Sequence, residues 1–217
     1  MFMSISHRSA LGDRASPYRH LVLLFALLVS GCAAAQSAPS SNEIEALERA
    51  LRQEVGRSDV FPTDSLPAIR WLAAPRYIAE GGQRHVVGVA QIQFKRLTNS
   101  YCRLVAQVEG APQLLVPTPE SAQHDACKGV GAAYTVDLNG DGRLDYVYSV
   151  KVASNRTGND VEDVMAFFRA SSGHQPYCYS SVASRHLAPS TLASVQTLQL
   201  AAKSLATRLN AAPIVCE

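Results

Sequence analysis

The spacing of oxygen-bearing side chains between residues 137 and 145 is the feature of this sequence that most clearly points to chemistry. The segment reads DLNGDGRLD and places Asp137, Asn139, Asp141 and Asp145 at positions one, three, five and nine, with a glycine at position six. Alternate spacing lets the first three short side chains converge on one point, and the glycine permits the sharp bend that brings the backbone round. The main-chain carbonyl of Arg143, at position seven, adds a fifth oxygen ligand.

A ligand set made only of oxygens suits a hard cation, and Ca²⁺ takes roughly six to eight oxygens at about 2.4 Å. Magnesium favours fewer protein ligands and a stricter geometry, and transition metals favour His or Cys, which the segment lacks. We therefore expect the loop to bind Ca²⁺ in a structural role. The alternative is a solvated turn that uses Asn, Asp and Gly only for their turn conformations.

The segment is not an EF-hand loop. Position twelve is Tyr148, where an EF-hand carries a bidentate glutamate. The flanking sequences AAYTV and YVYSV read as strands, so the loop is expected to close a β-hairpin. Water or the acidic segment at residues 159–163 would supply the missing ligand; that segment contains Asn159, Asp160, Glu162 and Asp163.

No constellation of catalytic residues is visible. The histidines His85, His124, His174 and His186 are scattered, no serine lies in a GxSxG elbow, and no glycine-rich phosphate loop is present. We expect a protein that is not an enzyme. An enzyme whose site is not apparent in the sequence is the alternative.

The N-terminus carries an export signal. Residues 21–29, LVLLFALLV, form an apolar run after the basic Arg19, too short for the roughly 20 residues that span a bilayer but long enough for a signal-peptide core. The following VSGC resembles the lipobox of bacterial lipoproteins, a family in which the cysteine (here Cys32) is lipidated and the chain is cut before it. The alternative is a secretory signal cleaved within the alanines of residues 33–35.

The lipobox resemblance implies a signal peptide over residues 1–31 and a lipid anchor at Cys32. Ala33, where retained lipoproteins have Asp, implies the periplasmic face of the outer membrane. Removal of residues 1–31 takes away three of the 20 basic and one of the 18 acidic residues, so the mature chain is formally neutral. Neutrality gives no electrostatic reason to expect nucleic acid as a partner.

The remaining four cysteines are expected to form two disulfides, because their number is even and the chain is exported. They are Cys102, Cys127, Cys178 and Cys216, and no pair has the CxxC spacing of a redox or zinc motif. Three connectivities are possible; we favour sequential pairing, with the second bridge holding the C-terminus on the domain. Each bridge would stabilise the fold by about 3–4 kcal/mol in the loop-entropy model.

The 217 residues, with 18% charged side chains, suffice for one domain with a substantial core. We expect a flexible tether over residues 32–41 and a single disulfide-bonded periplasmic domain over 42–217. An amphipathic helix is predicted over 42–55, capped by Ser40 with Glu43 or by Asn42 with Glu45. A C-terminal helix capped by Ser190 is predicted, whose helical period continues until Pro213.

Between these helices the chain reads as short strands separated by turn signals. The predicted strands are residues 84–94, 101–108, 113–116, 132–136, 146–152, 164–169 and 177–182. The fold class is therefore α+β, with an antiparallel sheet of about six strands flanked by the N- and C-terminal helices.

Two polar loops, residues 154–160 and 171–179, are candidates for contact with a protein partner. The second reads SSGHQPYCY, and a constrained loop with aromatic residues loses little entropy on docking. We select Ser172, Gly173, His174 and Tyr177 as its contact residues. The alternative is an ordinary hairpin turn with Tyr177 and Tyr179 packed inward.

The layout of residues 132–180, a strand, a DxNGDGxxD loop and three further strands, resembles small periplasmic proteins with one calcium loop of the FG-GAP or VCBS type. That group includes inhibitors of invertebrate-type lysozymes, and lipoprotein immunity proteins against lysozyme-like effectors of type IV secretion systems. The lysozyme inhibitors use a Ser-Gly-x-Tyr loop, whereas here His-Gln-Pro separates Ser172-Gly173 from Tyr177. The resemblance implies a protein that binds a periplasmic toxin or cell-wall hydrolase. A structural envelope lipoprotein without a toxin partner is the alternative.

Overall fold

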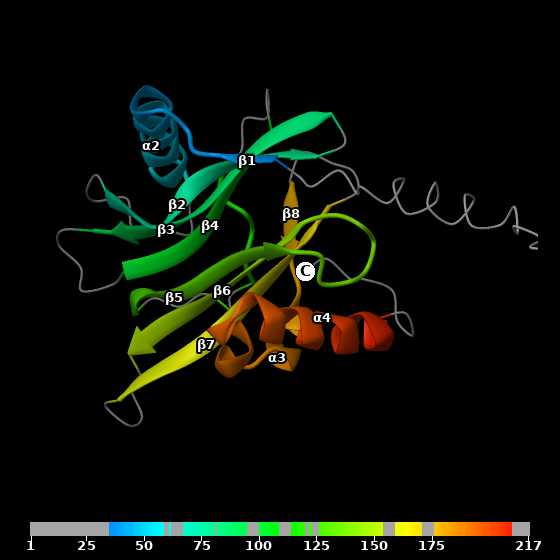
Figure 1. Cartoon of the computed structure of the whole chain (residues 1–217). Coiled ribbons are helices and arrows are strands. Elements are labelled where there is room, and N and C mark those ends of the chain that lie inside the picture. The colour runs from blue at the N-terminus through cyan, green and yellow to red at the C-terminus, as the bar shows by residue number, and fades with distance from the viewer. Residues whose placement is uncertain are drawn as a thin grey trace, which may run out of the picture. The chain divides into compact units, whose positions relative to one another are not determined.

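Two four-stranded antiparallel sheets form the centre of the protein (Figure 1). The first has the order β1-β2-β3-β4, from strands Ala35–Ser37, Ala68–Glu80, Gln83–Gln93 and Ser100–Val108. The second has the order β5-β6-β7-β8, from strands Cys127–Val136, Asp145–Ala153, Asp160–Arg169 and Tyr177–Tyr179. Within each sheet, neighbours in sequence are neighbours in space. The connection from β1 to β2, residues 38–67, is long and includes a helix.

The computed structural model describes residues 35–58, 61, 67–80, 82–94, 100–108, 114–119, 122, 126–153, 159–170 and 176–209. They belong to one compact unit that begins at Ala35. The predicted signal peptide and Cys32 lie outside the described residues.

Helix α2 (Ser41–Val55) covers the outer face of the first sheet. Its first turn is held by a capping box in which the Ser40 hydroxyl accepts from the Glu43 N–H and the Glu43 carboxylate accepts from the Ser40 N–H at 2.8 Å. The predicted apolar stripe is buried against the sheet through Leu47, Leu51 and Val55. The prediction of this helix is confirmed.

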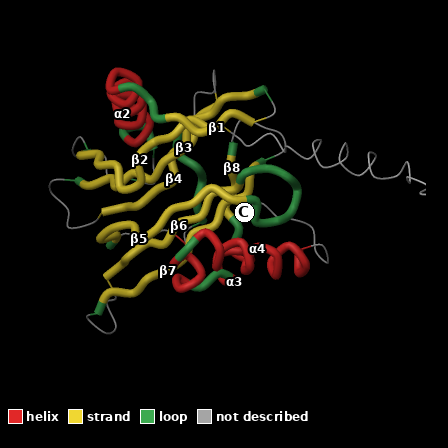
Figure 2. Tube along the Cα trace, viewed as in Figure 1, coloured by secondary structure: helices red, strands yellow, loops and turns green. Residues whose placement is uncertain are grey.

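The outer face of the second sheet is covered by the C-terminal helices, which Figure 2 shows in red on that side. They are α3 (Ser181–His186), the short 3-10 helix η2 (Pro189–Ala193) and α4 (Val195–Leu209). Leu198, Ala202, Leu205 and Leu209 bury one stripe of α4 in this core. The predicted single helix is interrupted at Ser194, whose extended backbone separates η2 from α4 and whose hydroxyl accepts from the Thr197 N–H.

The inner faces of the two sheets carry most of the buried aromatic rings. Tyr148 and Phe167 stack with ring centroids 6.0 Å apart, and His85 of the first sheet lies edge-on to Tyr177 of the second. A disulfide between Cys102 on β4 and Cys127 on β5, with Cα atoms 5.7 Å apart, joins the sheets covalently.

The α+β class and the flanking helices are confirmed, whereas the single sheet of about six strands is wrong. Strand β2 escaped prediction because it lacks clean alternation, contains Pro75 and shifts register twice between Trp71 and Arg76. Strand β1 lies within the predicted tether. Its three residues pair with β2, although the polar composition of this segment gave no strand signal. Instead of a strand, the predicted segment 113–116 contributes one bridge, between Leu115 and Val105.

Candidate functional site

The DLNGDGRLD segment closes the hairpin between β5 and β6, as predicted, because Val136 pairs with Asp145 on either side of it. The Asp137 carboxylate organises the turn: Oδ1 accepts from the Gly140 N–H at 2.6 Å and Oδ2 from the Gly142 N–H at 2.9 Å. Both glycines have φ near +80°, a conformation that a side chain disfavours. The two glycines are therefore required by the turn itself.

The next two polar side chains also turn toward the loop backbone. Asn139 Oδ1 accepts from the Asp141 N–H at 3.0 Å, and Asp141 Oδ1 accepts from the Arg143 N–H at 2.9 Å. Asn139 Nδ2 donates to Asp141 Oδ2 at 3.3 Å. Oxygens from positions one, three and five are thus held within one tight turn.

Asp145, at position nine, is fully buried. Its Oδ2 accepts from the Leu138 N–H at 2.8 Å, and its Oδ1 accepts from the Arg169 N–H at 2.7 Å. Burial raises the pKa of this carboxyl to about 8, and the charges of Asp141 and Asp137 act in the same direction, against the lowering effect of the two hydrogen bonds. A buried carboxylate beside two others is electrostatically unfavourable without a proton or a cation.

The chemistry of these donors fits a hard cation, since all are oxygens. Among the residues that the structure describes, however, no three His, Cys, Asp or Glu side chains are grouped closely enough to form a metal centre. Asp145 in particular directs both oxygens to backbone N–H groups. Ca²⁺ binding therefore stays a prediction.

The acidic segment expected to supply a further ligand lies at the wrong end of the sheet. Asp160 pairs with Ala153 at the far end of β6 and forms an ion pair with Lys128. At about 3.3 Å per residue, the length of β6 puts it roughly 25 Å from Asp145. The proposal that this segment completes the loop is wrong, because an antiparallel partner strand starts where its neighbour ends.

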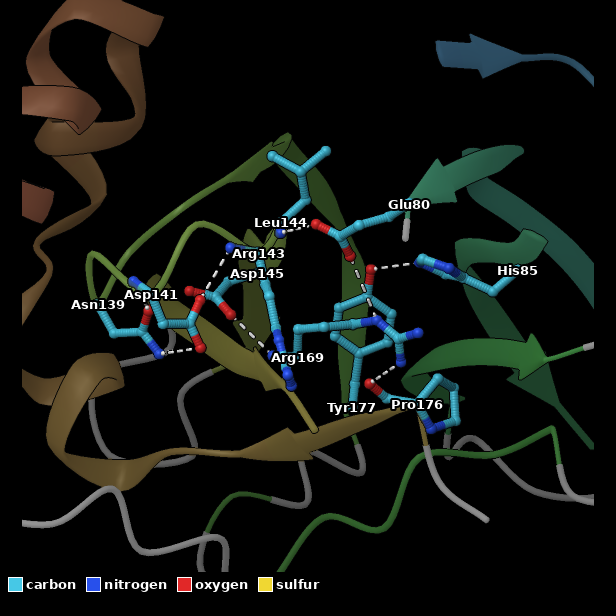
Figure 3. A network of polar contacts seen from close by, with 10 residues as sticks. All are labelled: Glu80, His85, Asn139, Asp141, Arg143, Leu144, Asp145, Arg169, Pro176 and Tyr177. Carbon is cyan, nitrogen blue, oxygen red and sulfur yellow. Dashed lines mark hydrogen bonds and ion pairs between the residues drawn. The ribbon is translucent and has the colours of Figure 1, made fainter. Parts of the chain in front are cut away.

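A chain of polar contacts links the loop to the first sheet (Figure 3). The Leu144 N–H donates to Glu80 Oε1 at 2.9 Å, and Glu80 Oε2 lies 3.6 Å from Nε of Arg169. Arg169 Nη1 donates to the Pro176 carbonyl at 2.7 Å. Because the Arg169 N–H also binds Asp145, this one residue contacts the loop, the first sheet and the start of β8.

His85 and Tyr177 complete this junction. His85 Nε2 and the Tyr177 hydroxyl share a 2.9 Å hydrogen bond, and the two side chains are 1% and 0% exposed. Burial lowers the pKa of His85 to about 4, and the charge of Arg169 adds to this effect, so the ring is neutral at pH 7. Its Nδ1 is buried without a hydrogen-bond partner in the described part of the chain.

The predicted partner-contact residues are only partly accounted for. Ser172, Gly173 and His174 lie outside the described residues. Tyr177 is fully buried and Tyr179 is 6% exposed, so both follow the inward-packing alternative and Tyr177 has no surface to offer a partner. Cys178 is disulfide-bonded, and Cys216, its predicted partner, lies outside the described residues.

Sequence reasoning missed Glu80, His85 and Arg169. Each comes from a different strand, and no spacing rule connects residues so far apart in the chain. The only local signal was Arg169 itself, a charged residue ending the apolar run VMAFF. A charged residue next to a buried strand is expected to have a buried partner. The sequence alone does not identify which residue that partner is.

No protein family, curated protein or solved structure matches the chain. In the described residues, no helix is both long enough and apolar enough to cross a membrane.

Proposed function

We propose that the chain is a lipid-anchored periplasmic lipoprotein that binds Ca²⁺ and acts as an inhibitor or immunity protein against a lysozyme-like, cell-wall-degrading toxin. The lipobox at Cys32 and the resemblance of residues 132–180 to calcium-loop inhibitors motivate the proposal. The protein would act by occupying its partner, without catalysing a reaction.

The observation that best supports this proposal is the position of Arg169. Through its N–H it contacts Asp145 of the loop, and through Nη1 it holds the Pro176 carbonyl. Pro176 ends the segment that carries Ser172, Gly173 and His174, the predicted contact residues. A rigid attachment lowers the entropy that a contact loop loses on docking. The loop would thus serve the binding surface by fixing its base.

In this proposal Ca²⁺ is held by side-chain oxygens of Asp137, Asn139 and Asp141, by the Arg143 carbonyl and by Asp145 directly or through water. The cation supplies positive charge to a turn rich in carboxylates. Hydrogen bonds hold the loop in place: Asp137 accepts from the Gly140 and Gly142 N–H groups, and Asp145 links the loop to β7.

Calcium binding is tested by calorimetric titration and by melting with Ca²⁺ and with chelator. Wild type is expected to bind one Ca²⁺ with a Kd of about 0.1–1 mM, as modules outside the cytosol commonly do, and to melt several degrees higher when loaded. The double variant Asp137→Ala/Asp141→Ala should melt, in Ca²⁺, like chelator-treated wild type. Asp160→Ala, at the far end of β6, is the matched control and should keep the Ca²⁺ response. A double variant that melts like loaded wild type contradicts the metal assignment.

Inhibition is tested with the mature domain, residues 33–217, against a panel of chicken-, goose- and invertebrate-type lysozymes in a peptidoglycan turbidity assay. Affinity capture from secreted and periplasmic extracts of the producing cell, with Ca²⁺ and with chelator, runs in parallel. The expected result is one hydrolase that is retained and inhibited at equimolar protein. If none is retained and none is inhibited, the toxin partner is excluded.

The alternative is a structural envelope lipoprotein. The inward packing of Tyr177, which removes the one aromatic contact residue from the surface, favours it. The same experiment separates the two functions, because a structural protein would show the Ca²⁺ effect on melting without inhibiting a hydrolase.

A further inference from the structure

The first strand of the domain begins very close in the chain to the predicted lipid anchor. Strand β1 pairs with β2 from Ala35 onward, with Ala35 opposite Ala79. Only residues 33 and 34 separate this strand from Cys32. At no more than about 3.6 Å per residue, three residues span at most about 11 Å in any conformation. A lipid attached to Cys32 would therefore keep this edge of the first sheet close to the bilayer surface.

The contacts of β1 and β2 determine which part of the domain is held there. Ala79, the partner of Ala35, is followed by Glu80, which ends β2. Glu80 Oε1 accepts from the Leu144 N–H at 2.9 Å, so the 137–144 loop lies at the same end of the strands. Figure 1 shows β1 and the loop between β5 and β6 toward this common end. We call it the anchor end, defined as β1, Glu80, residues 82–84 and the 137–144 loop.

The other end of the strands lies far from the anchor end. Strand β2 has 13 residues, from Ala68 to Glu80, and at about 3.3 Å per residue it extends over roughly 40 Å. In the second sheet, the Lys128–Asp160 ion pair marks the corresponding far end. The two ends can therefore be distinguished by their distance from a membrane.

The surface of the anchor end is polar. Its exposed residues are Gly82, Gln83, Arg84, Gly140, Asp141 and Gly142. In the part of the chain that the structure describes, the well-exposed large apolar side chains are Val161, Val182, Val195 and Leu200, and none belongs to the anchor end. Insertion among acyl chains requires apolar side chains, so a surface of this kind rests at the level of the headgroups.

Charge gives the domain no reason to lie flat on the membrane. Adhesion along a whole side requires buried apolar area or attraction to anionic lipid, and the mature chain is formally neutral. A neutral body tied to a surface at one end stays away from that surface elsewhere, because contact restricts its rotation without compensating attraction.

We propose that the anchor end lies against the phospholipid headgroups and that the strands extend away from the bilayer. This orientation rests on the lipid anchor of the function proposed above. It brings the predicted calcium loop close to the lipid. The Pro176 carbonyl lies at the same end, because Arg169 contacts both it and Glu80. A partner bound by the segment before Pro176 would thus be held at the membrane surface.

The test uses the full lipidated chain on vesicles of neutral phosphatidylcholine, in which attraction between net charges does not contribute. A fluorophore is attached at one position at a time through an unnatural amino acid, which leaves the disulfide cysteines intact. A nitroxide on the lipid headgroup quenches it at short range. Gln83 reports on the anchor end, and Ala68, also exposed but at the start of β2, is the matched control. We expect quenching at Gln83 to be several-fold stronger than at Ala68.

An insertion tests whether the short span sets this orientation. A Gly-Ser segment of about 12 residues, placed between Ala33 and Ala34, adds an average reach of roughly 20 Å. Quenching at Gln83 should then fall to about the level seen at Ala68. The same segment added after Glu217 is the control and should leave quenching unchanged. Circular dichroism establishes that each variant is folded.

Mass spectrometry of the purified chain separates this proposal from the function on which it rests. An unmodified Cys32 would overturn both the lipid anchor and the orientation. If Cys32 carries lipid, equal quenching at Gln83 and Ala68 would overturn the orientation alone. Strong quenching at Gln83 that persists after the insertion would do the same, because the short span would then not be its cause.

Discussion

At the scale of residues, the junction between the sheets brings together several buried polar groups from different strands. Arg169 is satisfied through three separate groups: its N–H binds Asp145, its Nε faces Glu80 and its Nη1 binds the Pro176 carbonyl. His85 beside it is kept neutral by burial. Polar groups in such a place stabilise the fold only while all their partners are present.

The first prediction concerns pH. The folded-state pKa of His85, about 4, lies below its ordinary value of 6.5. Between these two pH values the unfolded chain is protonated at His85 and the folded chain is not. Stability should therefore fall as the pH drops from about 6.5 to about 4, by up to about 3 kcal/mol, and gain nothing from this residue above 6.5. His85→Gln should remove this part of the pH dependence in urea unfolding curves. The control, His186→Gln in α3 outside the junction, should keep the wild-type profile. Identical profiles for His85→Gln and wild type would refute the assignment.

The second prediction concerns the ion pair. Glu80→Gln removes the charge opposite Arg169 but keeps an oxygen for the Leu144 N–H. We expect a loss of about 1–3 kcal/mol in the free energy of unfolding, because the Arg169 side chain is only 8% exposed and is left with an uncompensated charge. Glu45→Gln on the exposed face of α2 serves as the control and should change stability by less than about 0.5 kcal/mol. Equal stabilities of the two variants would show that the pair is not coupled to folding.

At the scale of elements, each sheet buries its outer face under its own helix. α2 seals the first sheet and α4 the second, and the two apolar clusters share no residue. The helices follow their sequence periodicity because a stripe of apolar side chains every three to four residues has only one way to be buried.

A core substitution in α2 tests this packing. Leu51 is fully buried between α2 and the first sheet, so Leu51→Ala should lower the free energy of unfolding by about 2–5 kcal/mol through lost burial and a cavity. Leu200→Ala in α4 makes the same change at a side chain that is 67% exposed and should cost less than about 0.5 kcal/mol. Denaturant unfolding measures both. Comparable losses for the two variants would mean that α2 does not pack as described.

At the scale of the whole molecule, the two sheets are joined by the Cys102–Cys127 disulfide as well as by the polar junction. The bridge closes a loop with a sequence separation of 25 residues. Such a loop restricts the unfolded chain without requiring any further contact in the folded one.

The fourth prediction concerns the stability of the protein without this disulfide. The double variant Cys102→Ser/Cys127→Ser should lose about 3 kcal/mol of unfolding free energy, because the unfolded chain regains its loop entropy. The measurement is urea unfolding of oxidised protein, with wild type in reductant as the comparison. An unchanged unfolding midpoint in the variant would exclude a stabilising role for this bridge.

Local patterns predicted much of the fold. α2 and β3 lie within a residue or two of their expected bounds, and the expected hairpin closes around residues 137–144. Local patterns failed where tertiary contacts determine the secondary structure. Strand β2 forms despite Pro75 and its bulges, and residues 35–37 form a strand because they pair with the edge of β2.

The sequence by itself determined the hairpin turn of the loop and the two amphipathic helices, because each depends on residues a few positions apart. The export signal stays a prediction from the same kind of local pattern. Only the tertiary structure decided that Glu80, His85, Arg169 and Tyr177 meet and that Tyr177 points inward. Those groups come from different strands, and their proximity follows from how two sheets stack. A pattern of side chains along the sequence cannot predict how the two sheets pack.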